Sequence, residues 1–297
     1  MAQSPAHQFG QIIGEIVEAA VFDPLQQIAD EHGLYLDYKH LRPARGGKRK
    51  VSWKDRHGND HDLDYVLEQG GSEEVLGRPK AFIETAWRRY TKHSRNKAQE
   101  IQGAILPLAE AYADCHPFRG VVLAGVFTAG SLAQLETNGF KILYFPYSSV
   151  IAAFADVGIE ASFDEATADA EFMKKVNRFK KLSAAKKAQL ITGLCAKHAA
   201  DLAKFLDLLR QSLRRGIDRI LVIPLYGASQ ELRSIRDAVA FIRSHPEGTG
   251  MYPFVRYAIV VGYSNGNEIR GDFRTKEEAI DFLERMTAYQ TAMPGAT

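Results

Sequence analysis

The chain has 297 residues, of which 45% are hydrophobic and 25% charged, and its formal net charge is +2. These proportions are typical of a globular protein, and the length suits two average domains or one enlarged α/β domain. No run approaches the roughly 20 apolar residues of a membrane span, residues 1–10 do not resemble a secretion signal, and Cys115 and Cys195 lack the spacing of a zinc knuckle. We therefore expect a cytoplasmic protein with reduced thiols and no membrane partner.

Hydrophobic periodicity in the first half of the chain predicts a sheet surrounded by helices. In chain order we expect helices over 9–21 and 24–32, strands over 34–38, 51–54, 61–68 and 81–87, a helix over 96–113, a strand over 120–127, a short helix over 131–137 and a strand over 140–146. The fold class that follows is α/β, with a mixed central β-sheet flanked by helices.

The second half begins with a helical and largely basic pattern over 164–215. Strands are expected over 217–226, 255–263 and 268–273, the last two joined by an Asn265-Gly266 turn, and helices over 230–243 and 275–289. We expect one core region over 1–160. Residues 161–297 are expected to form a helical insertion and a C-terminal α/β region packed on that core.

Positive charge is concentrated in three stretches of a chain that is nearly neutral as a whole. They span 42–56, 78–97 and 172–187, and the first two contain one acid each, Asp55 and Glu84. Such a distribution indicates a polarised surface that suits a polyanionic partner. For the third stretch a solvated helix face is an equally good interpretation.

Two acids stand in apolar surroundings on neighbouring expected strands. Asp64 lies in Leu-Asp-Tyr-Val-Leu and Glu84 in Ala-Phe-Ile-Glu-Thr-Ala-Trp. A carboxylate in so apolar a strand is costly to desolvate unless an opposite charge compensates it. Mg²⁺, which prefers one or two protein carboxylates together with water and phosphate oxygens, is a natural compensator. The alternative is a solvated Asp64 and an ion pair between Glu84 and Arg88 or Arg89.

The segment Trp87–Lys97, which follows Glu84, favours the first interpretation. It reads Trp-Arg-Arg-Tyr-Thr-Lys-His-Ser-Arg-Asn-Lys and leads into the long expected helix. Basic side chains interleaved with aromatic and hydroxyl groups suit backbone phosphates, and a helix N-terminus adds its dipole and free amides.

The sequence at this point resembles the PD-(D/E)XK nuclease superfamily, and within it the type II restriction endonucleases, over roughly residues 9–146. The resemblance implies a restriction endonuclease-like core over 1–160, with Asp64 and Glu84 as Mg²⁺ ligands and the backbone carbonyl of Thr85 as a further ligand. It also implies double-stranded DNA as substrate and a homodimer that matches a symmetric site. The helix over 9–21 carries two acids, Glu15 and Glu18, as the family's first helix does.

Two positions depart from the family pattern. Leu63 precedes the first acid where proline is usual, and Ala86 occupies the position of the family's lysine, two residues after Glu84. We expect Lys97 to replace that lysine as the group that orients the water, with Lys92 and Arg88 as the next choices. Glu100 is expected either as an extra acid or as a surface partner of Lys97.

The resemblance thus predicts a magnesium-dependent endonuclease that hydrolyses DNA phosphodiester bonds. The residues expected to line the DNA path are basic or polar and come from the loop before the first acid and from the segment after the second: Arg45, Lys48, Arg49, Lys50, Arg88, Arg89, Lys92, His93, Ser94, Arg95 and Asn96. Two alternatives stay open: a non-catalytic DNA-binding module on the same fold, and an α/β interaction protein whose basic stretches are only solvated.

Three rival patterns are weaker. Gly262-Tyr-Ser-Asn-Gly266 matches a nucleophile elbow, but a hairpin turn follows it and the last histidine, His245, precedes it. His57 and His61 match no zinc spacing and are expected in a solvated turn. The segment 120–131 lacks the glycine pattern and the lysine of a nucleotide-binding loop, so no nucleotide cofactor is expected.

Overall fold

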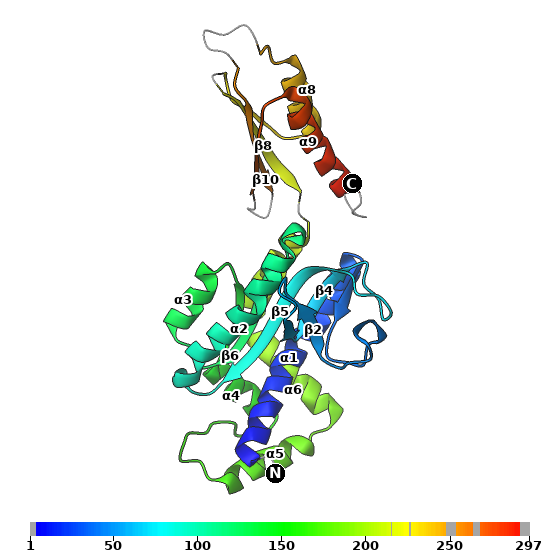
Figure 1. Ribbon diagram of the computed structural model, residues 1–297. Helices are drawn as coiled ribbons and strands as arrows, with labels where there is room; N and C mark the ends of the chain where they lie inside the picture. Colours follow the sequence, from blue (N-terminus) through cyan, green and yellow to red (C-terminus); the bar gives the residue numbers. More distant parts are fainter. Residues whose placement is uncertain (1–3, 215, 226, 248–253, 264–267, 292–297) are drawn as a thin grey trace. The chain divides into compact units, whose positions relative to one another are not determined.

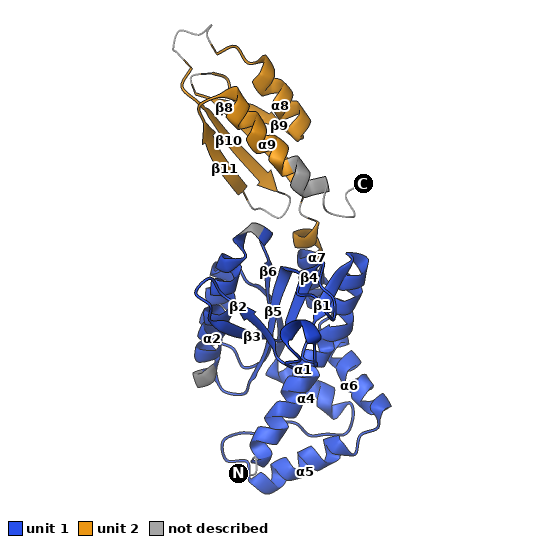
Figure 2. Cartoon of the chain, turned by 45° about the vertical axis from the view of Figure 1, so that its right-hand side comes forward, with its two compact units in different colours: residues 1–209 blue, residues 210–297 orange. Residues whose placement is uncertain are grey.

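The computed structural model describes residues 4–214, 216–225, 227–247, 254–263 and 268–291. The chain divides into two compact units, residues 1–209 and 210–297 (Figure 2). Each unit has a sheet and a hydrophobic core of its own.

A five-stranded mixed sheet forms the centre of the first unit. Its strands, in spatial order, are β1 (Leu34–Asp37), β4 (Tyr65–Gln69), β5 (Arg78–Arg88), β6 (Phe118–Gly125) and β7 (Lys141–Pro146). The pairs β1–β4 and β4–β5 are antiparallel, whereas the pairs β5–β6 and β6–β7 are parallel. The expected α/β class with a mixed central sheet flanked by helices is confirmed.

Helices cover both faces of this sheet (Figure 1). α1 (Pro5–Glu31) and α4 (Tyr147–Ala155) pack on one face, and α2 (Thr91–Ala111) and α3 (Ala129–Thr137) on the other. β6 shows the consequence, because Val121, Val122 and Leu123 are all fully buried in succession. A parallel strand covered on both faces reads as a continuous apolar run, and each such side chain contributes about 1.5–3 kcal/mol to stability.

Two helix boundaries differ from expectation. α1 is one helix that runs through Pro24, where two helices were expected. Val21, Leu25 and Ile28 are buried on both sides of the proline, so tertiary packing outweighs its local cost. α2 begins at Thr91, five residues earlier than expected, which places residues 92–96 within its first turns.

The expected strand over 61–68 is two strands with a bend at Asp64. β3 (Asp60–Leu63) pairs with β2 (Val51–Lys54) in a separate two-stranded sheet, while β4 pairs with β1 and β5. The chain changes partners at Asp64, and a straight strand cannot serve both sheets. Short 3-10 turns, η1 (Pro43–Arg45) and η2 (Ala113–Cys115), lie in the connections before β2 and after α2.

The helical segment after β7 belongs to the first unit. It comprises α5 (Asp169–Lys180), α6 (Ala184–Lys197) and α7 (Ala199–Leu213). α5 and α6 pack on α1, and α6 also packs on α4. The division between the units therefore falls after Leu209 and does not coincide with the boundary expected after residue 160. None of the helices in the described ranges is long and apolar enough to cross a membrane.

The second unit is an antiparallel sheet with both of its helices packed on one face. The sheet order is β11 (Glu268–Phe273), β10 (Tyr257–Tyr263), β8 (Ile217–Pro224) and β9 (Gln230–Leu232), and the helices are α8 (Ile235–Ser244) and α9 (Lys276–Thr291). Residues 230–232, expected as helix, are a strand, because the helix begins only after Ser234, whose side chain accepts from the Asp237 N–H. The expected Asn265-Gly266 turn lies outside the described residues.

Candidate active site

The two acids meet where β4 and β5 diverge. The register pairs Tyr65 with Ile83, so Asp64 and Glu84 are neighbours at the point where the chain bends away from β5. Asp64 Oδ2 accepts hydrogen bonds from the backbone N–H and the hydroxyl of Thr85, both at 2.7 Å. Thr85, expected to contribute its carbonyl, thus also orients Asp64 through its two donors.

Glu84 is largely buried, and only one of its two carboxylate oxygens has a partner. Its side chain is 14% exposed, and Lys97 Nζ on α2 lies 3.3 Å from its Oε1. Its other oxygen, Oε2, is buried and has no hydrogen-bond partner among the described residues. A buried carboxylate oxygen without a donor is rare in proteins and indicates a ligand site or stored strain.

The electrostatics of Glu84 follow from this geometry. Burial, reinforced by the negative charge of Asp64, raises the pKa of Glu84 to about 8, while Lys97 acts in the opposite direction. Glu18 on α1 belongs to the same group of acids, since burial and then Asp64 raise its pKa. Carboxylates with raised pKa values in one cluster are typical of functional sites that hold a cation.

The donor set limits what the site can hold. No three His, Cys, Asp or Glu side chains of the described residues are arranged to form a metal site by themselves. An ion here would depend on the pair Asp64 and Glu84, with the remaining positions taken by water and phosphate oxygens. That donor set is the one that Mg²⁺ uses, and the unpaired Oε2 of Glu84 fits it.

Lys97 lies at the expected place, but the two arginines after Glu84 differ from each other. Arg88 is partly exposed, donates to the Trp87 carbonyl at 2.8 Å and lies 3.7 Å from Glu100. Arg89 is held away from the acids. It donates to the Phe163 carbonyl at 2.8 Å, and its guanidinium lies 4.1 Å from the centre of the Tyr147 ring.

The prediction that Arg89 lines a DNA path is therefore wrong, because the Phe163 carbonyl and three aromatic rings, those of Tyr90, Tyr147 and Phe163, occupy its guanidinium. Glu100, also within 3.6 Å of Lys97, is largely exposed and is a surface partner of the two cations rather than a member of the buried acid group.

The first turns of α2 contain the remaining predicted contacts. Arg95 and Asn96 are exposed. Ser94 is fully buried and donates to the Thr91 carbonyl, so its predicted contact with DNA is wrong; its hydroxyl is used within the helix. Lys92 and His93 lie in the first turn of α2, and their side chains are outside what the structure describes.

The basic residues of the loop before β2 also differ from one another in exposure. Arg45 was expected to contact DNA, but its side chain is 3% exposed, lies 3.4 Å from Asp37 and donates to the carbonyls of Tyr38, His40 and Arg49. That prediction is wrong as a direct contact, since Arg45 holds the loop together. Lys48, Arg49 and Lys50 are exposed, so their side chains are accessible to a partner.

Sequence reasoning missed a second buried ionic cluster, formed by Asp37, Arg42 and Glu68. Arg42 donates to both carboxylate oxygens of Glu68, at 2.6 and 3.0 Å, and to the carbonyls of Ser72 and Val75. Its Nη1 lies 2.8 Å from Asp37 Oδ2, an ion pair without hydrogen-bond geometry. The sequence signal was an acid that follows apolar residues in each of two expected strands, Asp37 and Glu68.

Asp55 and its partner His61 have a structural role. Asp55 closes the turn before β3, where it accepts from the backbone of His57 and Asn59 and lies 3.0 Å from His61 Nε2, as expected for a turn rather than a metal site. These contacts, the His61 one first, lower the pKa of Asp55. Ser264 of the elbow-like motif lies outside the described residues.

Ser149, His198 and Asp201 form a hydrogen-bonded trio across three helices. Ser149 Oγ and His198 Nε2 are 2.7 Å apart, and His198 Nδ1 lies 3.2 Å from Asp201 Oδ2. The order matches a hydrolase triad, but the Asp201 side chain is 65% exposed, whereas the aspartate of such triads is buried. The trio ties α4 to the junction of α6 and α7.

Comparison with known proteins adds little. No family model matches the chain, and no curated protein matches it. The crystal structure of a protein of unknown function, AF1548, covers 65% of this chain and 98% of its own length, at 11% identity and a TM-score of 0.27. A TM-score of this size is too low to establish a common fold.

Proposed function

We propose that the protein is a divalent-metal-dependent endonuclease that hydrolyses phosphodiester bonds of DNA. The observation that carries the proposal is the pairing of Asp64 with Glu84, whose buried Oε2 lacks a donor and whose pKa is raised to about 8. In a protein that must fold stably, such a carboxylate calls for a cation. The resemblance of the sequence to PD-(D/E)XK nucleases gives the same pair the same role.

Each residue has a distinct part in this proposal. Asp64, held by the two donors of Thr85, and Glu84 would hold Mg²⁺. When bound, the ion supplies polarisation of the scissile phosphate and a lower pKa for the attacking water. Lys97 reaches Glu84 from α2, as expected of the lysine that replaces the one missing at Ala86, and stabilises negative charge that develops on the phosphate.

DNA is the proposed substrate because exposed cations lie on both segments that flank the acids. Lys48, Arg49 and Lys50 precede Asp64, and Arg95 follows Glu84 in the first turns of α2. Phosphate contacts of this kind position a duplex without reading its sequence. Cleavage of both strands at a symmetric site would further call for a homodimer, which sedimentation in the presence of DNA would detect. We place this activity in the cytoplasm.

The test is cleavage of plasmid DNA in Mg²⁺, with binding measured in Ca²⁺. Asp64→Asn and Glu84→Gln are expected to abolish cleavage while DNA binding remains, and Lys97→Met to lower the rate by about 10²–10³. Glu171→Gln is the matched control, because Glu171 is an exposed acid paired only with Lys174 on α5. Unchanged cleavage in Glu84→Gln would refute the proposed site.

A non-catalytic DNA-binding module is the second candidate, and one observation favours it. Ala86 occupies the family's lysine position and is buried, so a positive charge must come from another element. Intact but retarded DNA in Mg²⁺, with equal retardation for wild type and Glu84→Gln, would select this candidate.

A further inference from the structure

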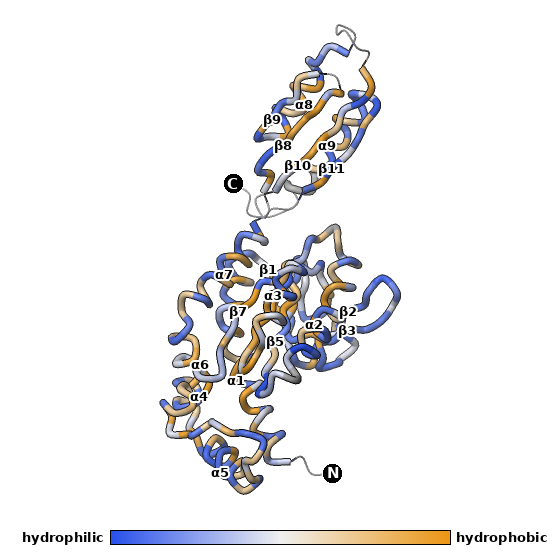
Figure 3. The backbone as a smooth tube through the Cα atoms, turned by 90° about the vertical axis from the view of Figure 1, so that its left-hand side faces the viewer, coloured by the Kyte–Doolittle hydropathy of each residue, from blue (hydrophilic) through white to orange (hydrophobic). Residues whose placement is uncertain are grey.

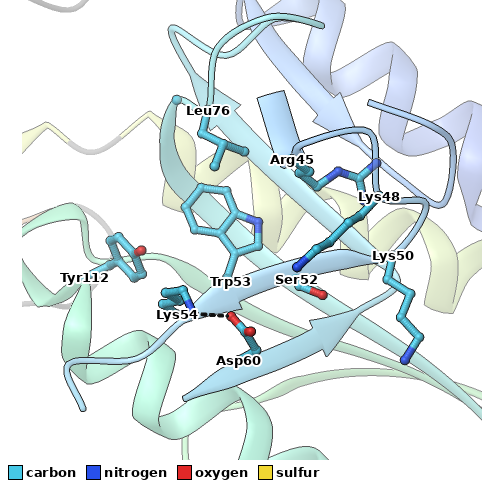
Figure 4. Close-up of a pocket in the computed structure, with 10 residues that line it drawn as sticks. Arg45, Lys48, Lys50, Ser52, Trp53, Lys54, Asp60, Leu76 and Tyr112 are labelled. Carbon is cyan, nitrogen blue, oxygen red and sulfur yellow. Dashed lines mark hydrogen bonds and ion pairs between the residues drawn. The ribbon is translucent and has the colours of Figure 1, made fainter. Parts of the chain in front are cut away.

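A cavity of about 340 Å³ lies beside the β2–β3 hairpin, on the segment that leads to Asp64. Figure 4 shows it between the hairpin, the loop before β2 and the end of α2. Its lining residues are basic on one side and apolar on the other: Arg45, Lys48, Lys50, Ser52, Trp53, Lys54, Asp60, Leu76, Gly77 and Tyr112. The volume lies at the lower end of the range for small-molecule sites.

The basic side of the cavity has an excess of positive charge. Lys54 pairs with Asp60 at 2.8 Å, and Lys50 pairs with Asp62 at the rim. Lys48 forms no ion pair with any described residue, and Figure 4 shows its side chain between Arg45 and Ser52. The hairpin and its loop are hydrophilic along much of their length (Figure 3). An anionic group is therefore the complementary ligand for this side.

Two hydrogen-bond donors of the lining residues lack acceptors. Trp53 Nε1 and Arg45 Nε are both buried without a partner among the described residues. Buried donors without acceptors are exceptional, and both belong to residues that line this cavity. The lining is thus richer in donors than in acceptors, and phosphate and nucleobase oxygens are complementary acceptors.

The other side of the cavity is apolar and rigidly held. Leu76 is 44% exposed although it is a large hydrophobic residue, and Tyr112 packs edge-on against Trp53 with ring centres 5.4 Å apart. The loop that carries Leu76 is tied to the sheet by Arg42, which donates to the Ser72 and Val75 carbonyls. A fixed apolar wall opposite a cation suits a planar group that bears a phosphate.

We propose that this cavity holds a single unpaired nucleotide of the DNA strand, with its phosphate at Lys48 and its base against Leu76 and Tyr112. The proposal rests on the proposed nuclease function for its choice of DNA over a free nucleotide. It goes beyond that function, because it assigns a second contact outside the acid pair. A nucleotide held outside the duplex would select substrates with an extruded, mismatched or single-stranded base next to the cut.

The experiment measures DNA binding in Ca²⁺ with two short duplexes that differ only by one unpaired thymidine. Trp87→Phe leaves Trp53 as the single tryptophan, so quenching of its fluorescence reports occupancy of the cavity. We expect the duplex with the unpaired thymidine to bind about tenfold more tightly than the paired one, the scale of one base contact, and to quench Trp53. Thymidine 5′-monophosphate serves as the free-nucleotide probe.

Lys48→Ala and Leu76→Asp are each expected to remove the preference for the unpaired thymidine. Both residues are exposed at the cavity, so neither change threatens the fold. Lys180→Ala, at an exposed lysine of α5, is the matched control and should keep the preference. Equal binding of both duplexes by the wild type, or a preference that survives both cavity variants, overturns the proposal.

Two outcomes distinguish a nucleotide of a DNA strand from a free nucleotide, and the cavity proposal from the nuclease proposal. Quenching by thymidine 5′-monophosphate, without any preference between the duplexes, would overturn the assignment to a DNA strand in favour of a free nucleotide. Cleavage in Mg²⁺ is scored separately. A preference for the unpaired thymidine without cleavage supports the cavity and refutes the nuclease, and cleavage without the preference does the reverse.

Discussion

Two buried acids in the same sheet, Glu68 on β4 and Glu84 on β5, have opposite surroundings. Glu68 is fully buried, and each of its oxygens accepts from Arg42, with a further bond of 2.6 Å from the Gly77 N–H to Oε2. Glu84 has one contact, 3.3 Å from Lys97, and an oxygen without a donor. Both positions carry the same residue type on neighbouring strands, so the difference lies in what the rest of the fold provides.

The comparison separates an acid whose charge the fold compensates from one whose charge it compensates only in part. The Glu68 cluster ties the loops before β2 and before β5 to the sheet. Arg42 and Arg45 balance the charges of Glu68 and Asp37, although neither oxygen of Asp37 accepts a hydrogen bond from the described residues. The ionised form of Glu84 is unfavourable in the folded chain, because Lys97 offsets its desolvation only in part. Proteins keep such unfavourable groups at sites where stability is exchanged for function.

Loss of Arg42 is expected to have the largest effect. Arg42→Met leaves Glu68 buried without its cation and Asp37 with Arg45 alone, which should lower the free energy of unfolding by about 3–5 kcal/mol. Urea unfolding followed by tryptophan fluorescence measures it, since Trp53 and Trp87 both lie in the first unit. Lys180→Met is the control for the same change on the surface. A loss below about 1 kcal/mol, the scale of an exposed pair, would place the cluster among the ordinary surface pairs.

Glu84→Gln should raise the free energy of unfolding at alkaline pH, whereas Arg42→Met lowers it. With a pKa of about 8 in the folded chain against an ordinary 4.5, Glu84 takes up a proton on folding, and the stabilisation from that uptake is lost as pH rises through this window. The wild type should therefore lose stability relative to Glu84→Gln by up to about 1.4 kcal/mol per pH unit between pH 5 and 8. Parallel pH profiles of the two proteins, measured without divalent cations, would contradict the buried and uncompensated state of Glu84.

Cation binding should release the proton that Glu84 takes up on folding. An ion that displaces the proton of Glu84 binds more tightly by about tenfold per pH unit below the pKa, and the dependence should level off above pH 8. Calorimetry in buffers of different ionisation enthalpy measures the protons released when Ca²⁺ or Mg²⁺ binds. Glu171→Gln, which removes an exposed acid paired with Lys174 on α5, is the control and should keep the full pH dependence. An affinity independent of pH between 6 and 8 would remove Glu84 from the ligands.

Sequence reasoning predicted most of the strands of the first unit and singled out Asp64, Glu84 and Lys97, because alternation and apolar neighbours are local signals. Asp64 and Glu84 are conspicuous for their strand context alone, and Lys97 lies on the helix that follows. The bend at Asp64 was not predictable in this way, since β3 and β4 both alternate and only pairing with two different sheets reveals the break.

The sequence likewise did not show which groups each arginine contacts. Arg42, Arg45 and Arg89 look like members of basic stretches, but buried carboxylates, carbonyls and rings from distant segments occupy them. A guanidinium can pair with groups in the interior, whereas lysines such as Lys48 keep their charge in water. Basic stretches therefore overstate a nucleic-acid surface wherever they contain arginines near buried acids.

The smallest effect is expected at Ser149, where the polar group is neither buried nor short of partners. Ser149→Ala removes one hydrogen bond to His198 and should cost about 0.5–1.5 kcal/mol of stability. Because the Asp201 carboxylate is mostly in water, it cannot stabilise a histidine cation as a buried aspartate does, and Ser149 should not react with a fluorophosphonate probe. Mass spectrometry of the probe-treated protein decides the point. Covalent labelling at Ser149 that Ser149→Ala abolishes would make the trio a second reactive site, and the distinction between compensated and uncompensated groups would then fail as a guide to function in this chain.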